Sequence, residues 1–251
     1  MRRHRSGDAP TGVLQRAALI LDAFDGADRL NLSQIVAATG LPRTSVHRAL
    51  EHLVTLRWIQ RDHMDYQLGM RMIELGATAI QQNSLRQAAL PSLQWLHRVT
   101  GCIVHLGVLD GTDVVYLDKV GGELAPGIRS RVGTRLPAYS STIGKALLAV
   151  DGSARFGSPD IHRVRESRIA YGREQCMKGF SCAAAPIGQL DREGAAAVSV
   201  FGSVTKVGVD RQVRMAVQTA AADIWRRAHA MRLPARQRLH QGKVPPQGLE
   251  P

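Results

Sequence analysis

The most informative segment of the chain is residues 33–56, which read SQIVAATGLPRTSVHRALEHLVTL. We predict a short first helix that the Ser33 hydroxyl caps and that Gly40 ends. Pro42 suits the first turn of a second helix, which we expect to run to residue 56. Two short helices joined by a glycine-bearing turn are typical of a helix-turn-helix.

The second helix separates apolar from polar side chains. At about 100° per residue, Val46, Leu50 and Leu53 share one face and are predicted to enter the core. The opposite face carries the side-chain types that read base edges and phosphates, near the start of the helix. We predict that five of these residues contact DNA: Arg43, Thr44, Ser45, His47 and Arg48. Since most polar helix faces are only solvated, a surface without a partner is the alternative, and His47 could simply pack on that surface.

A β-hairpin is predicted directly after this helix. The strand 57–61, a polar turn over 62–65 and the strand 66–68 form the expected pattern. Arg61 and His63 would lie at its tip, where they suit flanking phosphates or the minor groove. The tight turn, the polar helix face and the basic hairpin together favour double-stranded DNA as the partner.

Two longer helical patterns flank this head. Residues 12–26 place apolar side chains on one face, and Gly26 is expected to end that helix. Residues 73–99 predict a second helix, with Pro91 as its break or kink.

The second half of the chain mixes strands and helices, which makes the fold class α+β. The runs CIVHLGVL and DVVYLDKV flank Asp110-Gly111, a strong hairpin signal. We expect further strands in GIRSRV, AAAPIG and AAAVSVF. The expected helices cover 141–150, 160–170 and 207–230, the last with apolar residues such as Val209 and Val213 along it.

Composition sets outer limits on the function. Of the 251 residues 44% are hydrophobic, and the net charge of +12 is spread towards the C-terminal half, so charge locates no binding face. No apolar run is long enough to span a membrane, and no apolar core of a secretory signal follows the basic start. Three cysteines form no disulfide framework. We therefore expect a cytoplasmic protein without a membrane partner.

The whole chain resembles the IclR family of bacterial transcriptional regulators. The matching motifs run in collinear order from about residue 12 to 230: VLQRAALILDAF, LPRTSVHRALEHL, YQLGMRMIELG, VHLGVLDGTDVVYLDKV, VGTRLPAYSSTIGKALLA, GFSCAAAPI and AAVSVFG. The resemblance implies a winged helix-turn-helix, a linker helix and a GAF-like domain that binds a small-molecule effector. It also implies homodimers, often paired into homotetramers. The domains expected from it are a disordered basic arm (1–11), the winged helix-turn-helix (12–72), the linker helix (73–90), the GAF-like domain (91–231) and a disordered tail (232–251).

The resemblance also implies an effector site. The matching positions here are Leu136, Thr142, Ile143, Phe180, Cys182, Ser199 and Phe201. Ser140 and Ser141 join Ser199 as the polar groups that remain to orient a ligand. Gly172 and Phe201 stand where relatives that bind small carboxylates carry Asp and a second Ser. The loss of two polar groups predicts a more apolar pocket and a larger, apolar or aromatic ligand. Arg129, Arg131 or Arg135 could neutralise an acid, and Cys182 is equally well explained as a small core residue.

One further departure leaves effector binding open. The bridge DGSARFGSP replaces a longer helical stretch of the family, so part of the pocket wall could be missing. The main prediction is a regulator that binds an operator and responds to an effector, with repression favoured over activation. The alternative is a DNA-binding regulator without effector control, whose C-terminal domain only oligomerises.

An enzyme is the remaining alternative, and its motifs are incomplete. STIGKA lacks the first glycine of a phosphate loop, and Thr142 stands where an S-x-x-K nucleophile needs Ser. The cysteines and histidines lack zinc spacing. We therefore predict no catalytic residue, no metal site and no cofactor.

Overall fold

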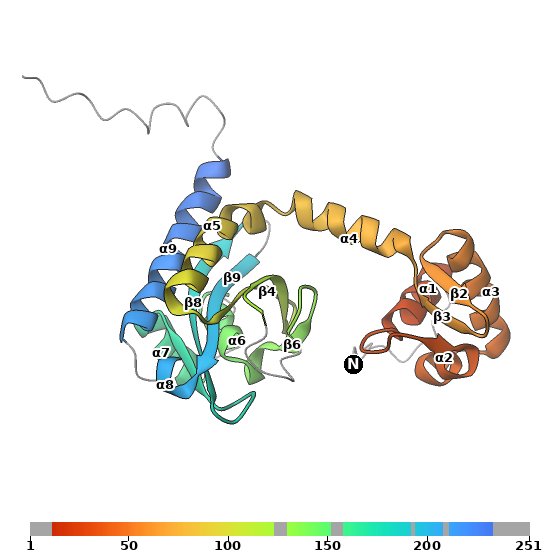
Figure 1. Cartoon of the computed structure of the whole chain (residues 1–251), viewed down its shortest axis with the longest axis horizontal. Helices are drawn as coiled ribbons and strands as arrows, with labels where there is room; N and C mark the ends of the chain where they lie inside the picture. Colours follow the sequence, from red (N-terminus) through yellow and green to blue (C-terminus); the bar gives the residue numbers. More distant parts are fainter. Residues whose placement is uncertain (1–11, 123–129, 152–157, 192–193, 208–210, 233–251) are drawn as a thin grey trace, which may run out of the picture. The chain divides into compact units, whose positions relative to one another are not determined.

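The computed structural model of the chain divides it into two compact units, Met1–Gln82 and Asn83–Pro251 (Figure 1). The described residues are 12–122, 130–151, 158–191, 194–207 and 211–232. The predictions for the arm, for most of the bridge after residue 151, and for all but the first residue of the tail lie outside them. No helix in the described ranges is both long and apolar enough to cross a bilayer.

The first unit contains four helices and a small sheet among its described residues. In chain order these are α1 (Val13–Asp22), β1 (Leu30–Asn31), α2 (Leu32–Thr39), α3 (Arg43–Thr55), β2 (Ile59–Asp62), β3 (Asp65–Leu68) and α4 (Met70–Gln82). The strands are antiparallel in the order β1-β3-β2. The predicted helix pair and hairpin are therefore present, and the structure adds the two-residue strand β1.

One small core holds this unit together. Ile20 of α1, Ile35 of α2, and Val46 and Leu50 of α3 are fully buried in a single cluster. The predicted core face of the second helix is confirmed, because Leu53 is buried there as well. Burying such side chains stabilises the unit by about 1.5–3 kcal/mol each, before entropy is subtracted.

Two predicted helix ends in this unit are wrong. The cap of α2 is Asn31, whose side chain accepts from the Gln34 backbone while the Gln34 side chain bonds back to Asn31. Ser33 instead lies within the helix. α1 ends at Asp22 rather than at Gly26, since the chain turns from residue 23 onwards.

The predicted helix over 73–99 is also wrong, because it is two helices. α4 ends at Gln82, and α5 (Ser84–Thr100) begins after Asn83, whose side chain accepts from the Arg86 backbone at 2.8 Å. Pro91 lies inside α5 and does not break it. Its ring is on the exposed side of α5, while the opposite side is deeply buried, so packing outweighs the lost backbone hydrogen bond.

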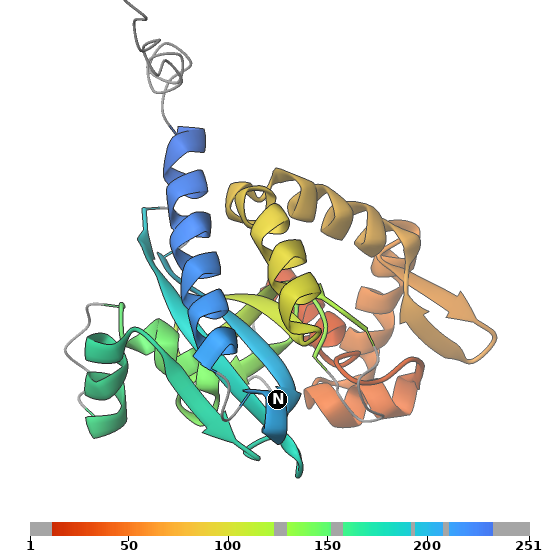
Figure 2. The same ribbon diagram turned by 60° about the vertical axis from the view of Figure 1, so that its left-hand side comes forward.

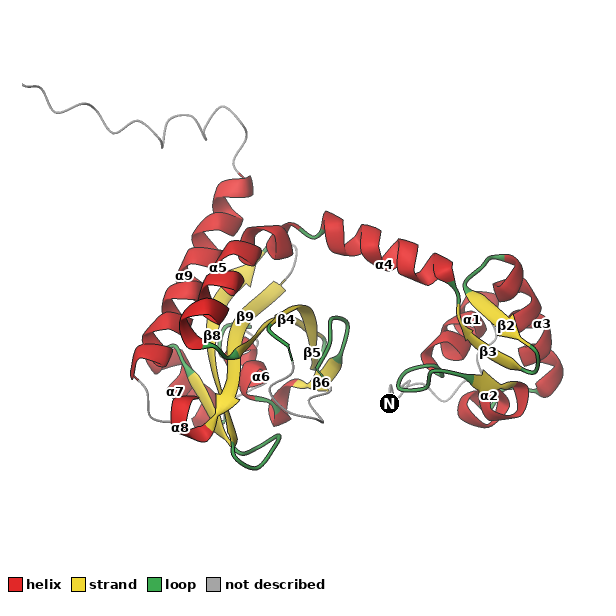
Figure 3. Ribbon diagram, in the orientation of Figure 1, coloured by secondary structure: helices red, strands yellow, loops and turns green. Residues whose placement is uncertain are grey.

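The second unit is built on a six-stranded antiparallel sheet (Figure 3). Its strands are β4 (Ile103–Asp110), β5 (Asp113–Val120), β6 (Arg135–Pro137), β7 (Ala170–Arg173), β8 (Phe180–Leu190) and β9 (Gly194–Ser203), in the order β6-β5-β4-β9-β8-β7. After α5, its remaining helices in the described ranges are η1 (Ala138–Ser140), α6 (Thr142–Leu148), α7 (Pro159–Ser167), α8 (Val204–Val207) and α9 (Arg211–Arg232).

Helices cover both faces of this sheet. α5 and α9 lie side by side on one face, where they bury residues such as Leu93 and Ile224 against Val198 (Figures 1 and 2). α6 and α7 pack on the other face, around residues such as Leu147 and Ala197. The strands therefore carry buried side chains on both faces, and β8 and β9 read as nearly continuous apolar runs.

The strand predictions of this unit need two corrections. Residues 130–132 of the predicted strand GIRSRV form no strand, and 127–129 lie outside the described residues. The next strand is instead β6, which pairs with β5, and β7 had not been predicted. The last predicted helix begins later, at Arg211, and Val209 is not described.

Candidate nucleic-acid interface and effector site

The polar face of α3 points away from the core of the first unit. Gly40 has a φ of +68°, a left-handed conformation that favours glycine and lets the chain reverse between α2 and α3. Of the five predicted residues on α3, Ser45 is half-buried and the others are exposed: Arg43, Thr44, His47 and Arg48.

These exposed side chains differ in their hydrogen bonds and ion pairs to the rest of the unit. Arg43 donates to the Ser33 hydroxyl at 3.1 Å, and His47 Nδ1 lies 3.6 Å from a Glu51 carboxylate oxygen. Arg48 makes no hydrogen bond or ion pair with the described part of the chain. Its guanidinium group is therefore free for a ligand, and its five donors suit the acceptor pair of a guanine.

The residues of the hairpin tip interact with neighbouring residues of the first unit. Arg61 Nε donates to the His63 carbonyl at 2.9 Å, and the Arg61 guanidinium lies 5.8 Å from the centre of the Tyr66 ring. His63 sits at a φ of +53° and its side chain is 96% exposed. Arg29 pairs with Asp62 at 2.7 Å, a contact that the sequence did not indicate because the two residues are far apart in the chain.

The predicted effector residues gather on the sheet face that α6 covers. Cys182 of β8 lies opposite Phe201 of β9, and the Phe180 and Phe201 rings stack with their centres 5.2 Å apart. Ser199 lies opposite His105 of β4. The pairing thus brings the four predicted strand residues to one face, two of them as an aromatic pair.

The start of α6 contributes the next residues. Ser141 caps α6 by accepting from the Gly144 backbone at 3.1 Å, and Thr142 donates to the Gln175 side chain at 3.3 Å. Thr142 lies against Gly172, at whose position a side chain would clash with its hydroxyl. Because Gly172 pairs with Cys182, Thr142 belongs to the same site.

Three other predicted effector residues lie farther from the strand residues of this site. Leu136 in β6 is half-buried, and Ile143 contacts Gly107 of β4. Ser140 is exposed and donates to the Pro137 carbonyl at 3.1 Å, so the structure does not bring it to the sheet face.

Sequence reasoning did not place two residues, His105 and Tyr116, in the effector site. His105 is buried, stacks on Tyr116 with ring centres 4.7 Å apart, and has its Nε2 2.8 Å from the Ser130 hydroxyl. The alternation of β4 puts His105 on the same face as Gly107, and this was the available signal.

The lining is electrically neutral near pH 7. Burial, and secondarily the charge of Lys119, lowers the pKa of His105 from 6.5 to about 4. Burial raises the pKa of the Cys182 thiol to about 12 and also raises the pKa of the Tyr116 hydroxyl. Of the arginines suggested as acid partners, Arg135 is already paired with Asp110 and Asp113, whereas Arg131 is exposed. The prediction for Arg129 lies outside the described residues.

The site is closed in this structure. Thr142, Ile143, Ser199 and Phe201 are all buried. Two hollows that the described surface does contain lie on the other face of the sheet, along α5 and α9.

Both units match known sequence families. Residues 13–63 match the IclR helix-turn-helix domain, and residues 77–159 match the C-terminal domain of the bacterial transcriptional regulator IclR. The HTH-type transcriptional regulator XynR of Escherichia coli (strain K12) is 30% identical over 219 residues, which span 77% of this chain and 87% of XynR. The chain belongs to the IclR family. Another relative of this IclR family member is the HTH-type transcriptional regulator KdgR of the same organism, 28% identical over 70% of this chain and 75% of KdgR.

Solved structures of IclR proteins share the fold. An IclR homolog of Microbacterium hydrocarbonoxydans, complexed with 4-hydroxybenzoate, has a TM-score of 0.74 at 22% identity and covers 87% of this chain and 100% of its own. A putative transcriptional regulator, RHA06195 of Rhodococcus sp. RHA1, has a TM-score of 0.70 at 26% identity, with 87% and 98% covered. The predicted fold class is confirmed.

These comparisons settle the broad function. The chain is an IclR-type transcriptional regulator with a DNA-binding helix-turn-helix and an effector-binding domain. The matched families and relatives are regulators rather than enzymes, so the prediction against an enzyme is confirmed.

Proposed function

We propose that this regulator binds a two-fold symmetric operator as a homodimer or homotetramer in the cytoplasm, and that an uncharged apolar or aromatic effector alters that binding. The observation that carries the proposal is the free Arg48 on the exposed face of α3, directly opposite a fully buried core face. Repression is the favoured outcome, because an operator-bound dimer blocks access to the DNA that it covers.

In this proposal α3 enters the major groove. Arg48 reads a base pair, while Thr44 and Ser45 in the first turn bind base edges or phosphates. Arg43 and His47 are held by neighbours and position the helix on the backbone. Arg61 and His63 contact the flanking phosphates or minor groove from the hairpin tip.

Unburied apolar side chains support the dimer. α4 contains no buried residue, yet Met70 and Ile73 are apolar and well exposed on it. Val13 and Leu14 of α1 are 72% and 83% exposed. Covering exposed apolar side chains of this kind lowers the free energy, and we propose that a second copy of the same unit covers them.

The neutral lining supports the class of effector. The Phe180–Phe201 pair offers an aromatic surface, and Ser199, Thr142 and the neutral His105 offer hydrogen bonds without a charge. The IclR homolog crystallised with 4-hydroxybenzoate is consistent with an aromatic ligand in this fold, but the proposal rests on the residues of this chain.

The closed site favours a second candidate function. The protein's own atoms bury Thr142 and Ser199, as expected of a regulator that had lost effector control. A thermal-unfolding screen separates the two candidates, because a ligand that binds only the folded protein raises its melting temperature. We expect aromatic alcohols or amides to raise it, and Phe201→Ser to shift the preference towards small acids. If no compound in aromatic and aliphatic panels shifts the wild-type protein, loss of effector control is favoured.

The test of DNA binding is selection from genomic fragments. The full chain is mixed with sheared DNA, and captured fragments are compared with random DNA by band shift at near-physiological salt. We expect one palindromic sequence, with half-sites about 34 Å apart or a multiple of that, to bind far more tightly than random DNA. Uniform, salt-sensitive binding to all fragments would contradict specific recognition.

A further inference from the structure

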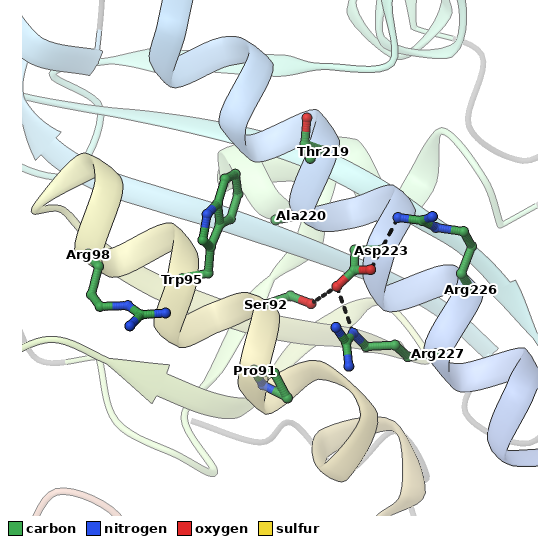
Figure 4. Close-up of a pocket in the computed structure, with 9 residues that line it drawn as sticks. All are labelled: Pro91, Ser92, Trp95, Arg98, Thr219, Ala220, Asp223, Arg226 and Arg227. Atoms are coloured by element: carbon green, nitrogen blue, oxygen red, sulfur yellow. Dashed lines mark hydrogen bonds and ion pairs between the residues drawn. The ribbon is translucent and has the colours of Figure 1, made fainter. Parts of the chain in front are cut away.

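A groove runs between α5 and α9 on the sheet face opposite the effector site. Two hollows of about 390 and about 360 Å³ lie along these helices, and both are lined by Trp95 and Thr219. Since they share these walls, the two hollows are neighbours on either side of Trp95, and we call the pair of hollows the groove. Figure 4 shows the Trp95 side chain standing between the two helices.

One end of the groove has an excess of positive charge. It is lined by Arg98, Arg226 and Arg227, with Asp223 as the opposing acid. The Asp223 carboxylate is already engaged, because Ser92 donates to it at 2.6 Å, Arg227 at 2.7 Å and Arg226 at 3.2 Å (Figure 4). Although burial would raise the pKa of Asp223, the hydrogen bonds from Ser92 and Arg227 and the two arginine charges hold it below its usual value.

Arg98 is the unmatched charge. It is exposed and makes no hydrogen bond or ion pair with the described residues, and it lies at the wall of the groove on α5. Because Asp223 can compensate only one of the arginines, this end of the groove attracts an anion. Exposed guanidinium groups bind carboxylates in a planar, two-bond geometry.

The other end of the groove is apolar. Val99 is 54% exposed and Met215 is 57% exposed, and both line it together with Ala216. Large apolar side chains that line a hollow and face water gain free energy when a partner covers them. Lys206 also lines this end and adds a further positive charge.

We propose that this groove binds an amphipathic helix of another protein, one that is rich in carboxylates and seats an apolar side chain beside Trp95. A groove with an aromatic centre, an apolar end and a cationic end matches the face of such a helix. The contact would give the regulator a protein partner away from both the DNA and the effector, a function beyond the one proposed above.

Charge disfavours the two occupants that this chain itself could supply. A symmetric contact between two copies of the groove would bring its cations together against a pair of engaged Asp223 carboxylates. Residues 233–251 carry three Lys or Arg and one acid, so this tail has the same sign of charge as the groove. An acidic partner is the complementary one.

The test uses a synthetic helix as the probe. A fluorescein-labelled peptide of about 16 residues, roughly 24 Å long as a helix, carries Leu and Phe on one face and Glu on the rest. A matched peptide has Lys in place of every Glu. Binding to the full chain is measured by fluorescence anisotropy. We expect saturable binding of the Glu peptide and none of the Lys peptide.

Matched variants place the binding in the groove. Arg98→Glu is expected to weaken the affinity for the Glu peptide at least about tenfold, since it reverses a free charge. Arg173→Glu makes the same change at another exposed, unpaired arginine of this unit and should leave the affinity within about twofold. Met215→Asp tests the apolar end and should also weaken binding. Circular dichroism confirms that each variant is folded.

Three outcomes would overturn the proposal. The first is that the Glu peptide does not bind, or binds no better than the Lys peptide. The second is that Arg98→Glu and Arg173→Glu weaken binding equally, which would indicate general charge attraction. The third is that the groove has another occupant. Dissociation of an oligomer by Met215→Asp would identify a second copy of the chain, and competition by random duplex DNA through Arg98 would identify DNA.

Discussion

At the scale of single residues, His105 shows how the fold sets the chemistry of the effector site. It is buried against Tyr116 and opposite Ser199, and its pKa of about 4 keeps the ring neutral at physiological pH. A neutral imidazole both donates and accepts a hydrogen bond, so the site can orient an uncharged polar group without attracting an acid.

The depressed pKa of His105 predicts a pH dependence of stability. Between pH 6.5 and about 4 the unfolded chain binds a proton at His105 and the native protein does not, so the free energy of unfolding falls as the pH falls. Above about pH 6.5 the titration of His105 does not change the free energy of unfolding. At about pH 4 that free energy is lower by about 3 kcal/mol, at 1.36 kcal/mol per pKa unit. We expect His105→Gln to flatten this part of the stability curve.

Urea unfolding at pH 7 and pH 4.5 measures this effect. His162→Gln is the control, because His162 is an exposed histidine whose removal should leave the slope unchanged. Equal slopes in the wild-type protein and His105→Gln would show that His105 does not carry the effect.

Sequence patterns predicted the burial of single residues better than their protonation state. The positions of Val46 and Leu50 followed from helical periodicity alone, and both are buried as predicted. The neutral state of His105 could not be predicted, because it depends on burial, and secondarily on the charge of Lys119, which only the folded chain brings about. The roles of the predicted DNA and effector residues stay predictions.

At the scale of elements, helix ends depend on local hydrogen bonds. α2 begins with a reciprocal pair of bonds between Asn31 and Gln34. Ser33 is an equally good capping residue by type, but its hydroxyl accepts from Arg43 of the next helix instead.

This difference predicts losses of stability of different size for two neighbouring substitutions. Asn31→Ala should lower the free energy of unfolding by about 1 kcal/mol, since the capping side chain is lost and only the bond from the backbone N–H of residue 31 to the Gln34 side chain remains. Ser33→Ala removes an exposed contact and should cost less than about 0.5 kcal/mol. Chemical denaturation of both variants measures the difference; a larger loss for Ser33→Ala would mean that Ser33 is the true cap.

Helices and long strands were largely predictable, and short or edge elements were not. The hairpin of β4 and β5 followed from Asp110-Gly111. β1 contains only two residues, and β7 is an edge strand whose pairing with β8 no local pattern records. The break at Asn83 was misplaced at Pro91, because burial of the opposite side of α5 keeps that helix intact.

At the scale of the whole molecule, the DNA-binding and effector-binding units meet in the chain between α4 and α5. If effector and operator binding are coupled, each must change the affinity for the other by the same factor. In the proposed dimer α4 is an interface element, because its apolar residues such as Ile73 are exposed in the single chain.

A substitution in α4 tests the dimer. Ile73 is 66% exposed, so Ile73→Lys should leave a monomer equally stable. In the proposed dimer two isoleucines leave the interface, which should weaken association by at least about 3 kcal/mol at about 1.5 kcal/mol each. Sedimentation over a range of concentrations measures this, with Met64→Lys on the hairpin turn as an exposed apolar control. Unchanged association of Ile73→Lys would remove α4 from the interface.

The most direct test of the central claim measures how Arg48→Ala changes operator affinity, with random DNA as the reference. Arg57→Ala is the control, since it removes the same charge from the same unit at a residue already near Glu74. We predict that Arg48→Ala weakens operator binding by about 1–3 kcal/mol and random binding much less, while Arg57→Ala leaves the preference for the operator intact. Equal losses on operator and random DNA, or no loss at all, would contradict sequence reading by α3.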